Sequence, residues 1–204
     1  KNITTIRNGI DCEKFRPTSK ASARRLFNLV QDDFIIGCAG RLEEVKGQDQ
    51  LIKALPLIPK RIKVVIAGDG SQRDALEQLA KKLNVSDRVI FLGLVEEMVS
   101  FYNALDVFCL PSRSEGLPLS SLEAQACNIP TVAMDVGAVK ETLCPATGHL
   151  VKADNVPHLA YSLFKTSQNE TLENFSNPRR YVLENFNISD MVESYNKLSE
   201  ESYV

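Results

Sequence analysis

The sequence predicts an α/β fold, a Rossmann-like doubly wound parallel sheet of about six strands followed by C-terminal helices. Short apolar runs alternate with amphipathic stretches, which is the order of strands and crossover helices in a parallel sheet. The runs are apolar at almost every position, as expected of strands that are covered on both faces. A chain of 204 residues suits one large domain, residues 1–204.

The first half of the chain contains three apolar runs that predict strands, at residues 34–40, 62–67 and 88–92. The stretch between the first two runs places apolar side chains on one helical face. It predicts a helix over residues 48–57. A second amphipathic helix follows the turn at residues 68–70, and residues 96–105 predict a short third helix.

The second half continues the same alternation. The predicted elements are a strand at 106–110, a loop at 111–117, a helix at 118–126, a strand at 130–134 and a short edge strand at 148–151. Pro118 suits the first helical turn because its missing N–H has no partner there. Asn128 can supply the left-handed residue after that helix. The pattern is helical after Asn155, and residues 172–204 are the predicted C-terminal helices.

Composition excludes several classes of protein. The formal net charge is −2, with the basic residues spread along the chain, so we expect no nucleic-acid partner. No apolar run reaches the roughly 18–20 residues of a membrane helix. The five cysteines are odd in number and favour reduced core thiols, which indicates the cytoplasm. The start has no signal-peptide pattern, and we interpret it as lying inside a longer protein.

Ligands of an open parallel sheet bind outside the carboxyl ends of its strands. Arg41 follows the first predicted strand, and Lys46 lies five residues further along. An arginine fork and a lysine point charge together suit a diphosphate. Two solvated loop charges are the alternative interpretation.

Gly68, Asp69 and Gly70 follow the second strand and could bring backbone close to a ligand. They do not form a Rossmann glycine motif, because Asp74 stands where the third glycine would be. An ordinary turn is the alternative.

Glu115 and Glu123 are the most informative pair. Glu115 lies in the loop after the fourth strand and Glu123 in the next helix, with Gly116, Leu117, Pro118 and Leu119 between them. Loop and helix-start N–H groups can hold phosphate oxygens, and the carboxylates can accept hydrogen bonds from hydroxyl groups on either side. A nucleotide sugar, with its ribose, diphosphate and sugar, has this layout. A surface glutamate and a helix-start glutamate are the alternative.

The two histidines, His149 and His158, stand alone without metal-ligand spacing, so we expect no metal site.

These features together resemble the C-terminal, donor-binding half of the family 4 retaining glycosyltransferases (glycosyl transferases group 1), which have the GT-B fold. The resembling segments are Gly40-Arg41-Leu42 with Lys46-Gly47, Val65 to Gly70, Val89 to Gly93, and the Glu-x7-Glu motif from Pro111-Ser112 through Glu115 to Glu123. Residues 1–17 resemble the interdomain segment of that family. The pair Gly137-Ala138 departs from the frequent Gly-Gly of the family.

The resemblance implies a role for each matching residue. Glu115, Arg41 and Lys46 would be catalytic. The donor would be bound by Arg41, Lys46, Gly68, Asp69, Gly70, Val95, Glu115, Gly116, Leu117, Pro118, Leu119 and Glu123. Arg41 and Lys46 would neutralise the diphosphate, Glu115 would contact the transferred sugar, and Glu123 the ribose. Backbone near Val95 would meet the base.

The resemblance also implies a function for the longer protein. It would transfer a sugar from a UDP- or GDP-sugar to a glycan or lipid-linked acceptor, in polysaccharide, lipopolysaccharide or glycolipid biosynthesis. An N-terminal domain absent from this chain would hold the acceptor, so the fragment alone would have little or no activity. No cofactor or essential metal is expected. The expected location is cytoplasmic, with the full-length protein peripheral at the inner membrane face. A nucleotide-sugar epimerase of GT-B-like fold and a non-catalytic nucleotide-sugar-binding module remain the alternatives.

Overall fold

The computed structural model describes residues 5–168 and 177–201. It contains one six-stranded parallel sheet in the order β3-β2-β1-β4-β5-β6, which confirms the predicted fold class. The strands are β1 (Phe34–Ala39), β2 (Ile62–Ala67), β3 (Val89–Gly93), β4 (Val107–Leu110), β5 (Thr131–Met134) and β6 (His149–Val151).

The order of the strands reverses between β1 and β4. The chain moves outward from β1 to β2 and β3, and then returns to place β4 on the other side of β1. The two loops that leave the carboxyl ends of β1 and β4 therefore run in opposite directions across the sheet. This topological switch point is where an open α/β sheet binds its ligands.

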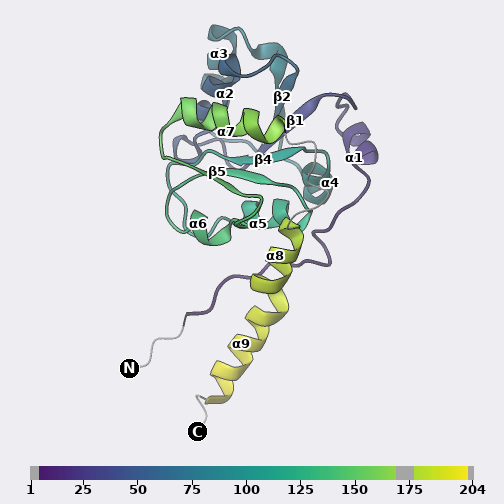
Figure 1. Ribbon diagram of the computed structural model, residues 1–204, viewed down its shortest axis with the longest axis vertical. Coiled ribbons are helices and arrows are strands. Elements are labelled where there is room, and N and C mark those ends of the chain that lie inside the picture. Colours follow the sequence, from purple (N-terminus) through teal and green to yellow (C-terminus); the bar gives the residue numbers. More distant parts are fainter. Residues whose placement is uncertain (1–4, 169–176, 202–204) are drawn as a thin grey trace.

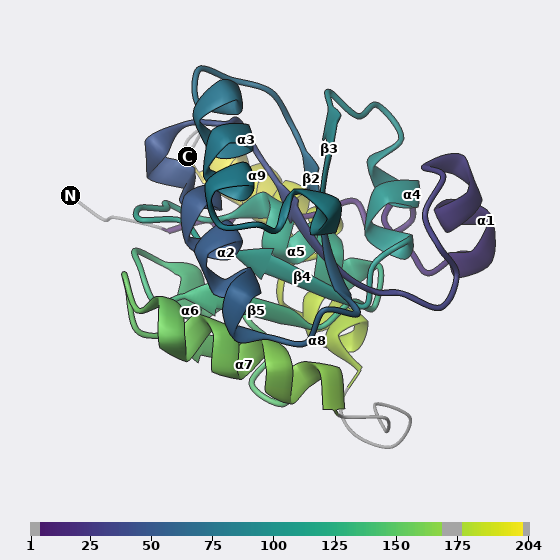
Figure 2. The same ribbon diagram turned by 90° about the horizontal axis from the view of Figure 1, so that it is seen from above.

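Helices cover both faces of the sheet (Figures 1 and 2). One face carries α2 (Gln48–Ala54), α3 (Arg73–Lys82) and α7 (Val156–Gln168). The other face carries α1 (Lys20–Leu26), α4 (Met98–Asn103), α5 (Leu119–Ala126) and α6 (Val139–Thr142). Short 3-10 turns are η1 (Glu44–Lys46), η2 (Leu55–Leu57) and η3 (Ser86–Arg88).

The core alternates along each strand as its geometry requires. In β4, Val107 and Cys109 point into the cluster under α2, α3 and α7, whereas Phe108 and Leu110 point into the opposite cluster. All five cysteines are buried and unpaired, which confirms the reading of reduced core thiols.

The structure corrects some predicted element boundaries. The helix predicted over residues 48–57 is α2 followed by η2, because Pro56 has no N–H to continue the α-helical ladder. The sequence analysis missed α1, which buries only Ala23 and Arg24 and so lacks a clear apolar stripe. Asn128 has a φ of 66°, in the left-handed region, as predicted.

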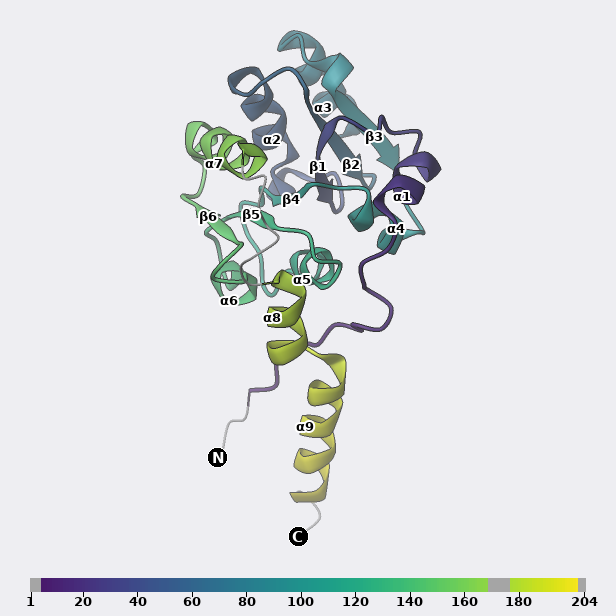
Figure 3. The ribbon, with the colours of Figure 1, turned by 45° about the vertical axis from the view of Figure 1, so that its right-hand side comes forward.

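The C-terminal helices are α8 (Pro178–Asn185) and α9 (Ile188–Glu201). Helix α8 packs on α5, and α9 projects away from the sheet (Figure 3). The segment before α1 runs beside their junction, where Ile10 N–H donates to the Phe186 carbonyl at 2.7 Å and Ile188 N–H donates to the Ile10 carbonyl at 3.0 Å. The predicted helix start at Leu172 lies outside the described residues. Within the described ranges, no helix is both long and apolar enough to cross a membrane.

Candidate functional site

The candidate site comprises Arg41, Lys46, Glu115 and Glu123, which all lie beyond the carboxyl ends of β1 and β4. The loop after β1 (residues 40–47) carries the two cations. The loop after β4 (residues 111–118) and the first turns of α5 carry the two carboxylates.

The two loops are bonded to each other through Arg113. Its backbone N–H donates to the Val45 carbonyl at 2.8 Å, and its guanidinium donates to the Glu44 carbonyl at 2.7 Å. The same guanidinium donates hydrogen bonds to both carboxylate oxygens of Asp49 on α2, at 2.8 and 2.9 Å. Such bidentate pairing fixes orientation as well as distance. The loops therefore form one rigid unit, with η1 held against the loop that carries Glu115.

Lys46 and Glu115 meet directly. Lys46 Nζ lies 2.8 Å from Glu115 Oε1, and the Ser112 hydroxyl donates to the same oxygen at 2.6 Å. The Glu115 side chain is only 9% exposed and that of Lys46 is 27% exposed, so the pair is shielded from bulk solvent. The structure thus brings together a cation and a carboxylate that the sequence analysis assigned to neighbouring groups of one ligand.

Arg41 differs from Lys46 in its surroundings. The Gln48 side-chain amide donates to the Arg41 carbonyl at 3.0 Å, which fixes the backbone at the end of β1. The side chain itself is exposed, and no described residue forms an ion pair with it. Arg41 is therefore a cation whose guanidinium is available to a ligand at this edge.

Glu123 is held by a tyrosine from another helix. The Tyr102 hydroxyl on α4 donates to Glu123 Oε2 at 2.6 Å. Burial raises the pKa of the Glu123 carboxyl, although the Tyr102 bond and the Lys14 charge oppose that shift. Burial and the neighbouring Glu123 charge raise the pKa of the Tyr102 phenol well above its ordinary value, so it stays a donor. A second carboxylate is thus held in a fixed direction at the start of α5.

The first backbone N–H groups of α5 can donate hydrogen bonds to a ligand. Pro118 is the N-cap and offers no side-chain hydrogen bond, so the first N–H groups of α5 lack a side-chain partner. Gly116 and Leu119 are exposed, whereas Pro118 is buried and Leu117 is half-buried. Such a helix start suits an anion, and contact of these residues with a donor stays a prediction.

The glycine turn after β2 has a structural explanation. A Cβ on Gly68 would lie 2.0 Å from the Gly40 carbonyl oxygen, and one on Gly70 would lie 2.6 Å from the Leu42 carbonyl oxygen. The Asp69 carbonyl accepts from Leu42 N–H at 2.9 Å, so the turn packs on the loop after β1. Close packing of two turns accounts for both glycines. Direct contact of Gly68, Asp69 and Gly70 with a ligand stays a prediction, as does that of Val95, whose half-buried side chain packs on the core.

Sequence reasoning missed two residues that hold the site together. The sequence pattern indicates only a core aromatic residue at Tyr102 and a charged loop residue at Arg113. The only local signal for Arg113 is its place two residues before Glu115, in the loop after β4. Neither histidine lies in the loops after β1 and β4, since His149 belongs to β6 and His158 to α7. No described group of histidine, cysteine and acidic residues has the arrangement of a metal site.

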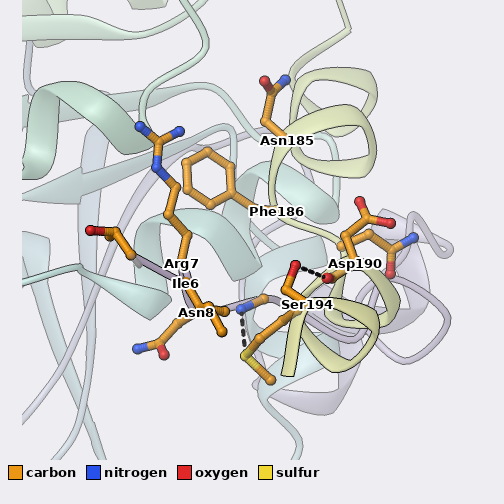
Figure 4. Close-up of a pocket in the computed structure, with 11 residues that line it drawn as sticks. Ile6, Arg7, Asn8, Asn185, Phe186, Asp190 and Ser194 are labelled. Atoms are coloured by element: carbon orange, nitrogen blue, oxygen red, sulfur yellow. Dashed lines mark hydrogen bonds between the residues drawn. The ribbon is translucent and has the colours of Figure 1, made fainter. Parts of the chain in front are cut away.

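A pocket of about 560 Å³ lies elsewhere, between residues 5–9 and the junction of α8 and α9 (Figure 4). Arg7 and Phe186 line one side of it and Asp190 and Ser194 the other. None of its lining residues follows a strand or belongs to the candidate site. The paired charges of the candidate site thus lie at the switch point and not in this pocket.

The family is decided by a sequence profile. The profile described as glycosyl transferases group 1 matches residues 19–200, which include every member of the candidate site. The chain belongs to this family. The match confirms the resemblance to group 1 glycosyltransferases, which the Glu-x7-Glu motif and the loop with Arg41 and Lys46 indicated.

Individual relatives agree with the family. Over 173 residues the chain is 36% identical to a GDP-mannose-dependent monoacylated alpha-(1-6)-phosphatidylinositol monomannoside mannosyltransferase of Corynebacterium glutamicum, covering 78% of this chain and 45% of the relative. Sucrose-phosphate synthase from Thermosynechococcus elongatus superimposes with a TM-score of 0.87 at 29% identity, covering 97% of this chain and 52% of that one. Anabaena Alr3699/HepE in complex with UDP-glucose gives a TM-score of 0.87 at 25% identity, covering 96% and 57%. The group 1 chain thus spans about half the length of these proteins.

Proposed function

We propose that this chain binds the nucleoside-diphosphate sugar of a retaining glycosyltransferase and acts as its donor half. The observation that carries the proposal is the contact of Lys46 with Glu115 across the switch point, at 2.8 Å. A cation in that position can reach a diphosphate, and the adjoining carboxylate can accept hydrogen bonds from the hydroxyl groups of the attached sugar.

The remaining groups extend the same layout. Arg41 adds an exposed guanidinium at the end of β1 that forms no ion pair with a described residue. The first N–H groups of α5 add a helix start that favours anions. Glu123 stands one helical turn beyond that start, at a suitable place for the ribose. The diphosphate would thus lie between two carboxylates that face the hydroxyl groups on either side.

The chemistry that these residues can assist is departure of the diphosphate. In sugar transfer, the bond between the anomeric carbon and the diphosphate oxygen breaks, and its electron pair leaves with the diphosphate. A bond from an acceptor hydroxyl oxygen to the same carbon forms, and the hydroxyl proton passes to the leaving diphosphate. Positive charge aimed at that oxygen lowers the barrier, because it stabilises charge that develops in the transition state. Arg41 and Lys46 are the residues that we propose for this role.

The rest of the enzyme is also part of the proposal. We propose that an N-terminal domain outside this chain holds a glycan or lipid-linked acceptor and closes over the donor, excluding water. The named mannosyltransferase relative uses GDP-mannose, and a UDP-glucose complex is known for a structural neighbour, so both nucleotides are candidates. That no metal or cofactor is needed, and that the protein works in the cytoplasm at the inner membrane face, stay predictions.

Titration calorimetry of the chain tests donor binding. The ligands are UDP, GDP, UDP-glucose and GDP-mannose, with uridine and guanosine as controls that lack the diphosphate. We expect one of the two nucleotide families to bind, and its nucleoside to bind at least about 100-fold more weakly, because most of the charged contacts are to phosphate. If none of the diphosphates binds at millimolar concentration, or if nucleosides bind equally well, the proposal is wrong.

A further inference from the structure

The hydroxyl of Tyr102 has an unusual place for a core tyrosine. The residue is fully buried, and its ring packs edge-on against those of Phe15, Phe101 and Phe108 at centroid separations of 6.1, 5.5 and 5.6 Å. A buried tyrosine hydroxyl needs a hydrogen-bond partner, and backbone carbonyls supply many such partners in proteins. Here the partner is instead the Glu123 carboxylate, at 2.6 Å.

The carboxylate depends on this bond for its direction. Tyr102 is the only described side chain that donates to Glu123, and it donates to Oε2 alone. The remaining oxygen, Oε1, accepts no hydrogen bond from a described residue. Because the ring of Tyr102 is fixed by its three aromatic neighbours, the hydroxyl fixes where Oε2 lies and hence where Oε1 points.

A fixed carboxylate oxygen has a specific use at a ribose. The 2′- and 3′-hydroxyls lie on adjacent carbons, so one carboxylate oxygen can accept a hydrogen bond from both of them. A freely rotating carboxylate would bind the ribose more weakly, because ordering it on binding costs conformational entropy and water competes for its oxygens. Holding it in advance strengthens binding of the ribonucleotide without a new contact.

We propose that Tyr102 is a positioning residue, which holds Oε2 of Glu123 so that Oε1 receives the ribose hydroxyls of the donor and discriminates against a 2′-deoxynucleotide. The inference rests on the proposed function, because it needs a nucleotide at this edge. It also assigns the aromatic cluster of Phe15, Phe101, Tyr102 and Phe108 a part in ligand selection.

The test measures a ratio of affinities by calorimetry. UDP and 2′-deoxy-UDP, and likewise GDP and 2′-deoxy-GDP, are titrated into the chain and into Tyr102→Phe, which removes only the hydroxyl. We expect the wild-type chain to prefer the ribonucleotide by about tenfold, as for a hydrogen bond to a charged group. In Tyr102→Phe that preference should fall by about threefold or more, mainly through weaker ribonucleotide binding.

The matched control is Tyr181→Phe. Its hydroxyl donates to the Glu141 carbonyl at 2.9 Å, so the same atom is removed from a bonded tyrosine outside the site. This control should keep the wild-type preference. A purely structural role for Tyr102 would lower both affinities equally and leave their ratio unchanged, and that result overturns the inference.

Two further outcomes separate the inference from the proposed function. If the wild-type chain binds neither UDP nor GDP, the donor-binding proposal fails and the inference fails with it. If Tyr102→Phe does not fold, a crystal structure of the wild-type chain with the bound diphosphate decides. Oε2 should remain within about 3 Å of the Tyr102 hydroxyl while Oε1 contacts the ribose. A Glu123 side chain that has left Tyr102 in the complex overturns the inference.

Discussion

Lys46 Nζ and Glu115 Oε1 lie 2.8 Å apart although 69 residues separate them in the chain. The contact joins the loop after β1 to the loop after β4 at the point where the strand order reverses. Because Ser112 donates to the same carboxylate oxygen, Glu115 is held from two sides. Any anion that enters this edge therefore meets a cation already paired with a fixed carboxylate.

Lys46→Ala should weaken the binding of a nucleoside diphosphate. A hydrogen bond between ammonium and phosphate is worth about 1.5–3 kcal/mol, so we expect an affinity about 10- to 100-fold lower by calorimetry. The matched control is Lys197→Ala on α9, which also breaks a lysine–glutamate pair, at 2.6 Å, but on an exposed helix. The control should bind normally, and an unchanged affinity in Lys46→Ala would remove Lys46 from the diphosphate site.

Glu115→Gln should strengthen the binding of a nucleoside diphosphate that carries no sugar. The substitution removes a negative charge beside the phosphates and releases Lys46 from its ion pair, so UDP or GDP should bind about three- to tenfold more tightly. The added preference for the sugar nucleotide over the bare diphosphate should decrease, because an amide accepts sugar hydroxyls less strongly than a carboxylate. Calorimetry with both ligands measures the two effects. Glu193→Gln, the partner of Lys197, is the control, and weaker diphosphate binding in Glu115→Gln would contradict this account.

The sequence predicts the fold because its strands are short, apolar and buried on both sides. Each strand can be recognised from its own residues, and a parallel order follows from the helices between them. The Glu-x7-Glu motif also predicts the edge at which the candidate site lies. By contrast, α1 was missed because its buried face consists of one alanine and one arginine.

The contacts inside the site could not be predicted in the same way. No spacing rule connects Tyr102 with Glu123, because the two residues lie on different helices and meet only through packing. The pair Gly137-Ala138, which stands where the family frequently has Gly-Gly, is a second example. The structure requires glycine only at the first position, and Ala138 adopts an ordinary φ of −92°. The second family glycine is therefore replaceable here for a reason that only coordinates reveal.

Gly137→Ala should destabilise the chain and disturb the Glu115 loop. A Cβ at this position would lie 1.8 Å from the Glu115 carbonyl oxygen, and the φ of 52° is itself strained for alanine. We expect the free energy of unfolding to fall by at least about 2 kcal/mol in urea denaturation. Gly116→Ala is the control in the same region, because a Cβ there would have no described residue within 4 Å other than its chain neighbours. Its stability should stay within about 0.5 kcal/mol of wild type, and equal stabilities for both variants would refute the packing of this turn.

Glu123→Gln should stabilise the folded chain in a pH-dependent manner. Burial raises the pKa of the Glu123 carboxyl above its unfolded value, so the folded state holds this proton more tightly than the unfolded state. Wild-type stability therefore falls as the pH rises from the unfolded pKa, about 4.3, through the higher folded pKa. Glutamine cannot ionise and keeps an oxygen that can accept from Tyr102.

The stability advantage of Glu123→Gln should therefore be largest at pH 7 and should shrink as the pH is lowered towards 4, as measured by urea denaturation at several pH values. Glu193→Gln is the comparison with the opposite sign, because the hydrogen bond from Lys197 lowers the pKa of the Glu193 carboxyl. That variant should gain nothing at pH 7. If Glu123→Gln is no more stable than wild type at pH 7, or if its stability gain does not vary with pH, the buried charge of Glu123 does not destabilise the folded chain. Its retention would then need no functional explanation, whereas a charge kept at a cost to stability is expected where a ligand uses it.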